Sequence, residues 1–233
     1  MESVATHASR LQVTASDLSG YGPVEGLPEL REALAEILHV RAADLIVTTG
    51  ASEALQLSLT CMADPGDTVR TPRPAFPGFD QLASLSGLRI EHYTAPGDLS
   101  WPEPPEVTAT VICTPHNPTG VITSRTVLPT RTRGWTIWDI SHTSLFGADA
   151  DEFRHGLAES EILVCSLSKL LRLPGARLGC LISGSSALIR AVTAAKTHMS
   201  ISAGLPGQML ALELRDPAME LEMKHRQRGS ALV

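Results

Sequence analysis

The sequence predicts an α/β fold, in which helices connect the strands of a sheet and cover its faces. The first observation is alternation, because short runs rich in β-branched residues are separated by amphipathic stretches. The second is that no internal repeat or low-complexity segment interrupts this pattern. The third is that 233 residues, of which 43% are hydrophobic and 19% charged, suit one large globular domain with a buried core.

The N-terminal third begins with a helix that we expect over residues 27–38, where leucine and isoleucine recur at helical spacing behind a proline. Residues 45–50 are expected to form a buried strand that ends in a turn, and residues 51–62 the helix that leaves this turn. The sequence DPGD at residues 64–67 ends that helix. A second strand is expected at residues 68–72.

Five more strands and three more helices show the same two patterns. We expect the strands at residues 88–93, 108–114, 135–139, 162–166 and 178–183. We expect the helices at residues 78–85, 185–197 and 206–215, and the charged segment 220–233 also has helical character.

The charge and the cysteines argue against several classes of protein. A formal net charge of −6, with no basic run anywhere, argues against nucleic-acid binding. No apolar run approaches membrane length and the N-terminus lacks the pattern of a signal peptide, so we expect no membrane partner and a cytoplasmic location. The four cysteines have neither CxxC nor metal-ligand spacing, which predicts buried, reduced thiols and no metal site.

Lys169, one of only three lysines, lies in the sequence SLSK after a β-rich run and before a Pro-Gly turn. A lysine that bonds covalently to a cofactor must lose its proton near neutral pH, which burial and neighbouring cations favour. Ser166 and Ser168 are close enough in sequence to hydrogen-bond an anion. Without further motifs, a surface lysine after a strand would be the simpler interpretation.

Two further motifs are suited to bind an anion. Arg177 occurs in PGARLG, eight residues after Lys169, and a guanidinium makes two parallel hydrogen bonds to a phosphate. Gly50, Ala51 and Ser52 occupy a strand–turn–helix junction in TTGASEAL, where the N–H groups of a helix start can bind an anion. A structural salt bridge for the arginine and an ordinary helix cap for the serine are the alternatives.

Three more residues complete the pattern: Asp139 at the end of WTIWD, Asn117 in TPHNPTG and Phe76 in RPAFPGF. Each alone has a structural alternative, as a helix cap, a turn residue and a core aromatic. In their order and spacing, the motifs together resemble the aspartate-aminotransferase superfamily, the fold-type I enzymes that depend on pyridoxal 5′-phosphate (PLP). The similarity is greatest to the branch that contains histidinol-phosphate aminotransferase and threonine-phosphate decarboxylase.

The resemblance implies a fold and a domain arrangement. It runs from Tyr21 to the C-terminus and implies a three-layer α/β/α sandwich with a mainly parallel, seven-stranded-type sheet. Residues 1–20 would be an N-terminal arm and residues 21–233 the PLP-binding large domain, with the family's C-terminal small domain absent. Tyr21 matches a family tyrosine that reaches the phosphate of the neighbouring subunit, which implies a homodimer.

The resemblance also implies a role for each motif residue. Lys169 would form a Schiff base with PLP and then transfer protons, and Asp139 would hold the proton on the pyridine nitrogen. Asn117 would donate to the 3-oxygen of the ring, and Phe76 would stack on the ring. The residues expected at the anion site are Gly50, Ala51, Ser52, Ser166, Ser168 and Arg177.

The chain also departs from the family pattern. His142, in DISH, stands where the family usually has a tyrosine that contacts the 3-oxygen, so an imidazole N–H is expected there. The family arginine that binds the α-carboxylate of the substrate has no match. The resemblance implies a PLP-dependent enzyme of aminotransferase type that acts on the α-amino group or Cα of an amino acid, in specialised biosynthesis. A lyase, decarboxylase or cyclase acting on an unusual amino acid and a non-catalytic, truncated partner subunit are the alternatives.

Overall fold

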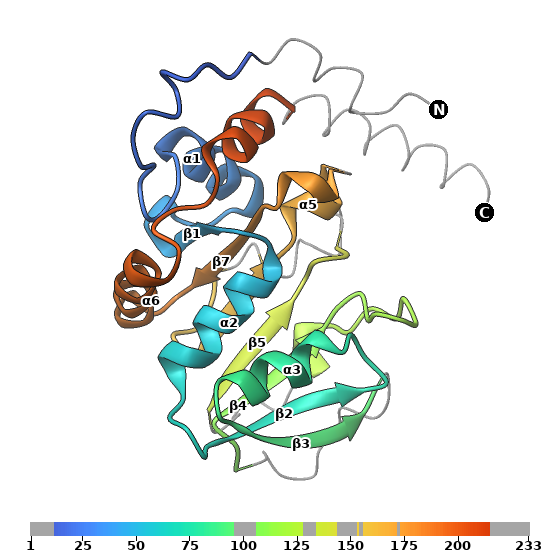
Figure 1. The fold of residues 1–233 in the computed structure, drawn as a ribbon. Coiled ribbons are helices and arrows are strands. Elements are labelled where there is room, and N and C mark those ends of the chain that lie inside the picture. Colours follow the sequence, from blue (N-terminus) through green and yellow to red (C-terminus); the bar gives the residue numbers. More distant parts are fainter. Residues whose placement is uncertain are drawn as a thin grey trace, which may run out of the picture.

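The computed structural model describes residues 12–95, 106–127, 134–143, 153, 156–171 and 173–214. Within these ranges, seven strands form one sheet in the order β1-β7-β6-β5-β4-β2-β3 (Figure 1). The strands are β1 (Leu45–Thr48), β2 (Thr68–Arg73), β3 (Arg89–Thr94), β4 (Ala109–Cys113), β5 (Trp135–Asp139), β6 (Glu161–Cys165) and β7 (Gly179–Ser183). The helices are α1 (Pro28–Leu38), α2 (Ala51–Met62), α3 (Gly78–Leu85), α5 (Leu167–Leu170) and α6 (Ser186–Met199), and residues 205–214 are also helical.

The direction of the strands brings several strand ends together. β7 runs antiparallel to both of its neighbours, β1 and β6, whereas the other neighbouring strands are parallel. The carboxyl ends of β1, β4, β5 and β6 therefore meet at one edge of the sheet, together with the start of β7. The register places Asp139 of β5 between Cys113 of β4 and Val164 of β6. In the same way, Thr48 of β1 lies opposite Gly179 of β7.

Several strands are buried along their whole length because helices cover both faces of the sheet. Every residue of β1, β4 and β7 is buried, which is typical of a sheet between two helical layers. Trp138 and Leu163 belong to a core cluster that includes α1 and residues 205–214, whereas Ile137 and Val164 belong to a cluster that includes α2, α3 and α6. The predicted three-layer α/β/α sandwich with a mainly parallel, seven-stranded sheet is therefore confirmed (Figure 1).

The expected helices and strands agree with the structure to within two residues at each described end. The short helix α5, which carries Lys169, and the 3₁₀ turn Pro174–Ala176 were not predicted, because each is too short to show a periodic pattern. Arg215 and the segment 220–233 lie outside the described residues. The domain bounds stay predictions. None of the helices in the described ranges is long and apolar enough to cross a membrane.

Candidate active site

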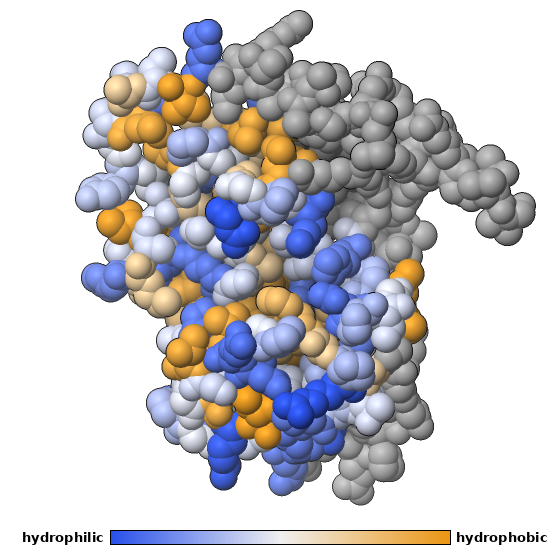
Figure 2. All heavy atoms as spheres, turned by 45° about the vertical axis from the view of Figure 1, so that its right-hand side comes forward, coloured by the Kyte–Doolittle hydropathy of each residue, from blue (hydrophilic) through white to orange (hydrophobic). Residues whose placement is uncertain are grey.

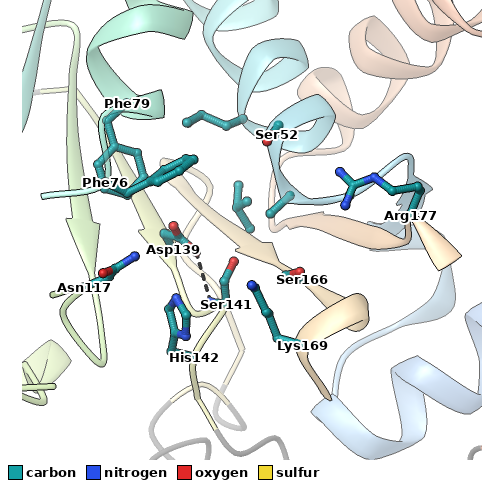
Figure 3. Close-up of a pocket in the computed structure, with 14 residues that line it drawn as sticks. Ser52, Phe76, Phe79, Asn117, Asp139, Ser141, His142, Ser166, Lys169 and Arg177 are labelled. Atoms are coloured by element: carbon teal, nitrogen blue, oxygen red, sulfur yellow. Dashed lines mark hydrogen bonds between the residues drawn. The ribbon is translucent and has the colours of Figure 1, made fainter. Parts of the chain in front are cut away.

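A cavity of about 290 Å³ lies at the edge of the sheet where the strand ends meet. Its walls come from the start of α2, the chain around the start of α3, the segments after β4, β5 and β6, and the turn before β7. Figure 3 shows the side chains of Asp139, Lys169 and Arg177 directed toward this shared space. The lining residues are Gly50, Ala51, Ser52, Leu55, Phe76, Phe79, Asn117, Asp139, Ser141, His142, Val164, Ser166, Lys169 and Arg177.

Ten of the twelve site residues predicted from the sequence line this cavity, all except Ser168 and Tyr21. The sheet topology explains why residues so far apart in the chain meet. Asp139 ends β5, Ser166 comes directly after β6, and Asn117 lies four residues beyond β4. Because these strands are parallel neighbours, the residues after each strand arrive at the same edge of the sheet.

One end of the cavity, at the start of α2, is suited to an anion. The N-cap residue, Gly50, has a φ of 83° and no side chain with which to cap the first N–H groups of the helix. The Arg177 guanidinium lies against this turn, since a Cβ placed on Gly50 would come within 3.0 Å of Arg177 Nη2. Arg177 Nη1 also donates to the carbonyl of Pro174 at 3.2 Å. A helix start and a guanidinium side by side form a site for a phosphate or a carboxylate.

Asp139 supplies a carboxyl group to the cavity. Its Oδ1 accepts a hydrogen bond from the backbone N–H of Ser141 at 2.9 Å. Burial raises the pKa of Asp139, while the hydrogen bond from Ser141 and the nearby His142 act in the opposite direction. A carboxylate in such surroundings is stabilised by a cationic partner, because the partner offsets the desolvation of the charge.

Lys169 lies in α5, which begins directly after Ser166. Its backbone N–H donates to the carbonyl of Ser166 at 3.0 Å, which closes a turn at the end of β6. The side chain of Lys169 lines the cavity but is exposed, so the burial expected to activate this amine is not found. The reason for this correction is the face on which Lys169 lies. Leu167 and Leu171, four residues apart, turn one face of this helical turn into the core, and Lys169 lies on the opposite face.

Two phenylalanines form the aromatic wall of the cavity. Phe76 and Phe79 meet edge to face, with ring centroids 5.7 Å apart and an interplanar angle of 89°, which is a favourable arrangement. Phe79 is buried and fixes the position of Phe76, which is 44% exposed. Sequence reasoning identified Phe76 and missed Phe79, although the three-residue spacing in RPAFPGF could have indicated the pair.

Three other lining residues were also missed. Leu55 of α2 and Val164 of β6 add apolar surface. Ser141 is more informative, because its buried hydroxyl lies near the Asp139 carboxyl, whose pKa it lowers, yet makes no hydrogen bond of good geometry among the described residues. A buried hydroxyl without a well-formed hydrogen bond at the wall of a cavity marks a place where a bound molecule can supply the missing bond. The signal in the sequence was a polar residue two positions after the strand-end Asp139.

Ser168 and Tyr21 do not line the cavity. The Ser168 hydroxyl donates to the carbonyl of Leu178 at 3.1 Å and accepts the N–H of the same residue at 3.0 Å. Because its single donor is used there, the predicted role of Ser168 at the anion site is wrong, and its role is to tie α5 to the start of β7. Tyr21 is 85% exposed and lies away from the cavity of its own chain. Its predicted contact concerns a second subunit and stays a prediction.

Comparison with known proteins identifies the family. The sequence model of the family described as aminotransferase class I and II matches residues 1–229. The chain belongs to this family. The transaminase OxyQ of Streptomyces rimosus, named for 4-dedimethylamino-4-oxo-anhydrotetracycline, is 32% identical over 83% of this chain and 58% of its own length. An aspartate/prephenate aminotransferase from Thermus thermophilus is 28% identical, over 83% of this chain and 56% of its own.

Solved aminotransferase structures share the fold. A mutant aspartate aminotransferase from Thermus thermophilus superposes with a TM-score of 0.78 at 24% identity, over 97% of this chain and 69% of that one. An aminotransferase from Mycobacterium tuberculosis superposes with a TM-score of 0.75 at 22% identity, over 94% of this chain and 63% of that one. At such identities the likeness shows the fold alone. The chain spans less than two thirds of the length of OxyQ and of the Thermus thermophilus aspartate/prephenate aminotransferase.

Proposed function

We propose that this chain binds PLP in the cavity and catalyses the transfer of an amino group to or from an amino acid. Members of the class I and II aminotransferase family depend on PLP. The observation that carries the proposal is the convergence of Lys169, Asp139 and Arg177 on one cavity (Figure 3). They supply an amine, a carboxylate and a guanidinium, which suit the aldehyde, the ring nitrogen and the phosphate of PLP.

The remaining lining residues also fit this cofactor. A volume of about 290 Å³ is close to that of the smaller pockets that hold small molecules. The exposed ring of Phe76 offers a stacking surface, and Val164 adds an apolar contact. The buried Ser141 hydroxyl, which makes no hydrogen bond of good geometry to the described side chains and backbone groups, is left with a hydrogen bond to make. The cavity thus combines apolar walls with a few polar groups that orient a ligand.

Each polar group of the cavity then has a task. Arg177 and the N–H groups at the start of α2 bind the phosphate, and Asp139 keeps the proton on the ring nitrogen. Asn117 and His142 donate hydrogen bonds to the 3-oxygen. Lys169 would hold the cofactor through its amine, and the same amine would carry the proton to and from Cα of the substrate. When bound, the cofactor supplies an electron sink for the negative charge that develops at Cα.

The substrate is proposed to be an amino acid of specialised biosynthesis. The identity to OxyQ, a transaminase named for an anhydrotetracycline, supports the specialised setting. A second candidate reaction, of lyase type, is favoured by two observations. His142 replaces the usual tyrosine at the 3-oxygen, which changes the group that tunes the cofactor. In addition, 1-aminocyclopropane-1-carboxylate synthase 4 from Arabidopsis thaliana is 28% identical over 76% of this chain and 46% of its own length.

We also propose a homodimer in which Tyr21 of one subunit reaches the phosphate site of the other. The 85% exposure of Tyr21, just before α1, supports this contact. Other large hydrophobic residues are exposed as well, and hydrophobic residues lie among hydrophilic ones on the face in Figure 2. Among all the described residues, the exposed large hydrophobic side chains include Leu18, Phe76, Val121 and Ile122. The cytoplasmic location predicted from the sequence stays a prediction.

The test of the proposed function uses the small number of lysines, which are Lys169, Lys196 and Lys224. The protein is incubated with PLP and reduced with borohydride, which makes the covalent bond permanent, and the modified peptide is located by mass spectrometry. We expect the adduct on Lys169. We expect Lys169→Ala to lose both the adduct and amino-group transfer while keeping its circular dichroism, because this side chain is exposed.

Arg190→Ala, which changes an exposed charged residue of α6, is the matched control and should behave as the wild type. An adduct on either of the other two lysines, or one that persists in Lys169→Ala, would refute the assignment. Product analysis then separates the two candidate reactions. Conversion of the amino acid to its 2-oxo acid indicates transfer, whereas loss of its carboxylate or of a side-chain leaving group indicates a lyase.

A further inference from the structure

The start of α2 carries a negative charge beside the proposed phosphate site. Glu53 is the third residue of α2 and comes directly after Ser52, which lines the cavity. A carboxylate in the first turn stabilises a helix, because it faces the positive end of the helix dipole. The same carboxylate repels any other anion bound at that helix start. The proposed site therefore requires that the charge of Glu53 be offset.

Glu53 turns toward α6, where a network of hydrogen bonds holds it. Lys196 Nζ, in the last turn of α6, lies 3.2 and 3.3 Å from the two carboxylate oxygens and donates to Ser200 Oγ at 2.9 Å. Ser200 in turn donates to Glu53 Oε1. The backbone N–H of Thr49, just before the helix, donates to Glu53 Oε2. The network therefore joins the end of α6 to the turn that precedes α2.

The ion pair between Glu53 and Lys196 is largely removed from water. The side chain of Lys196 is fully buried and that of Glu53 is 13% exposed. Burial acts to raise the pKa of Glu53, but the hydrogen bonds from Ser200 and Thr49 and the Lys196 ammonium outweigh it and lower the pKa. A buried ion pair often stabilises a fold no more than well-packed apolar residues of similar size would. Its presence at this place therefore points to a role other than stability.

We propose that Lys196 is a positioning residue for the cofactor phosphate and acts through Glu53. Lys196 cancels the charge beside the helix start. The bond from Thr49 to Glu53 holds the turn in which Gly50 adopts its φ of 83°. The N–H groups at the start of α2 then meet an anion without a competing charge. This inference rests on the proposed function, because it concerns the same site.

PLP and pyridoxal are matched probes for this role, since pyridoxal has the same ring and aldehyde but no phosphate. Absorbance titrations give the dissociation constants of both for the wild type, Lys196→Met and Glu53→Gln/Lys196→Met. In Lys196→Met the uncompensated carboxylate should weaken PLP binding roughly two- to thirtyfold, the range for one charge at a helix end. Pyridoxal binding should change much less. The double variant, with neither charge, should regain the wild-type ratio of the two constants.

A second ion pair provides the control. Arg125 and Glu161 have side chains that are 20% and 13% exposed, and Glu161 begins β6 at the end of that strand away from the cavity. Arg125→Met should lower the melting temperature, because it leaves the Glu161 carboxylate without its cation. It should leave the ratio of PLP to pyridoxal affinity at the wild-type value.

Equal losses for PLP and pyridoxal in Lys196→Met would show a purely structural role and overturn the inference. A double variant that keeps the selective loss would overturn it as well. If Lys196→Met does not fold, the single variant Glu53→Gln tests the inference. Its amide oxygen can still accept the hydrogen bond from the Thr49 N–H, but the negative charge is removed. That variant should keep or raise the preference for PLP, and a lower preference contradicts the inference. A wild-type protein that binds neither aldehyde contradicts the proposed function itself, which is a distinguishable result.

Discussion

Gly179, the first residue of β7, lies against the backbone of the proposed phosphate site. A Cβ at this position would lie 2.5 Å from the carbonyl carbon of Gly50 and 2.6 Å from the nitrogen of Ala51. It would also lie 2.7 Å from the carbonyl oxygen of Cys165. All three are backbone atoms, so no side chain can rotate to make room. The substitution Gly179→Ala therefore acts directly on the start of α2.

The size of the effect can be worked out from these distances. An ordinary van der Waals contact begins at about 3.4 Å, whereas the added Cβ would lie 2.5 Å from the carbonyl carbon of Gly50. The peptide between Gly50 and Ala51 must therefore move by roughly 0.9 Å. Overpacking of this kind costs about 1–3 kcal/mol of unfolding free energy. We expect the upper half, because Gly179 pairs with Thr48 of β1 and the next residue, Cys180, pairs with β6. The shift also displaces the N–H groups of α2. Losing one hydrogen bond to a charged group, about 1.5–3 kcal/mol, weakens PLP binding roughly ten- to hundredfold.

Urea denaturation of the apoprotein measures the first effect and absorbance titration with PLP the second. Gly175→Ala is the matched control, because Gly175 lies four residues earlier and a Cβ there would meet nothing within 4 Å. We expect the control to bind PLP as the wild type does and to change stability by less than about 1 kcal/mol. If Gly179→Ala and Gly175→Ala have the same free energy of unfolding and the same dissociation constant for PLP, the close approach of β7 to the start of α2 is refuted.

Two further substitutions test individual residues of the site. Burial raises the pKa of Asp139 above its ordinary value of 3.8, so above pH 3.8 the folded apoprotein binds more protons than the unfolded chain. The contribution of Asp139 to the free energy of unfolding therefore falls as the pH rises from 3.8 through the raised pKa. The fall is about 1.4 kcal/mol for each pKa unit of the shift. Asp139→Asn should therefore remove that fall from the pH dependence of the apoprotein melting temperature and also weaken PLP binding; an unchanged pH profile would contradict this account. Ser168→Ala leaves the Leu178 N–H without its partner and should lower the free energy of unfolding in urea by about 1–3 kcal/mol while the Lys169 adduct remains. Loss of that adduct at unchanged stability would instead support a direct contact between Ser168 and the cofactor.

The cavity could be anticipated in large part because its residues lie at or just beyond strand ends. Asp139, Asn117 and Ser166 each come at the end of an apolar, β-rich run or shortly after one, and parallel neighbours bring such positions to one edge. The prediction was wrong for Ser168, which lies only two residues from Ser166. Which of the two serines faces the cavity depends on how α5 turns back onto Leu178, and a one-turn helix leaves no periodic pattern in the sequence.

The positions of helices and strands, and the motif residues at their ends, could be inferred from the amino-acid order alone. Periodicity, turn residues and strand ends are local properties, and the alternation of elements then restricts the sheet topology. The contact of Lys196 with Glu53, 143 residues away, and the approach of Gly179 to Gly50 were apparent only in the folded chain. Such contacts depend on how whole layers pack against one another, because a close-packed core places each segment through all of its neighbours at once.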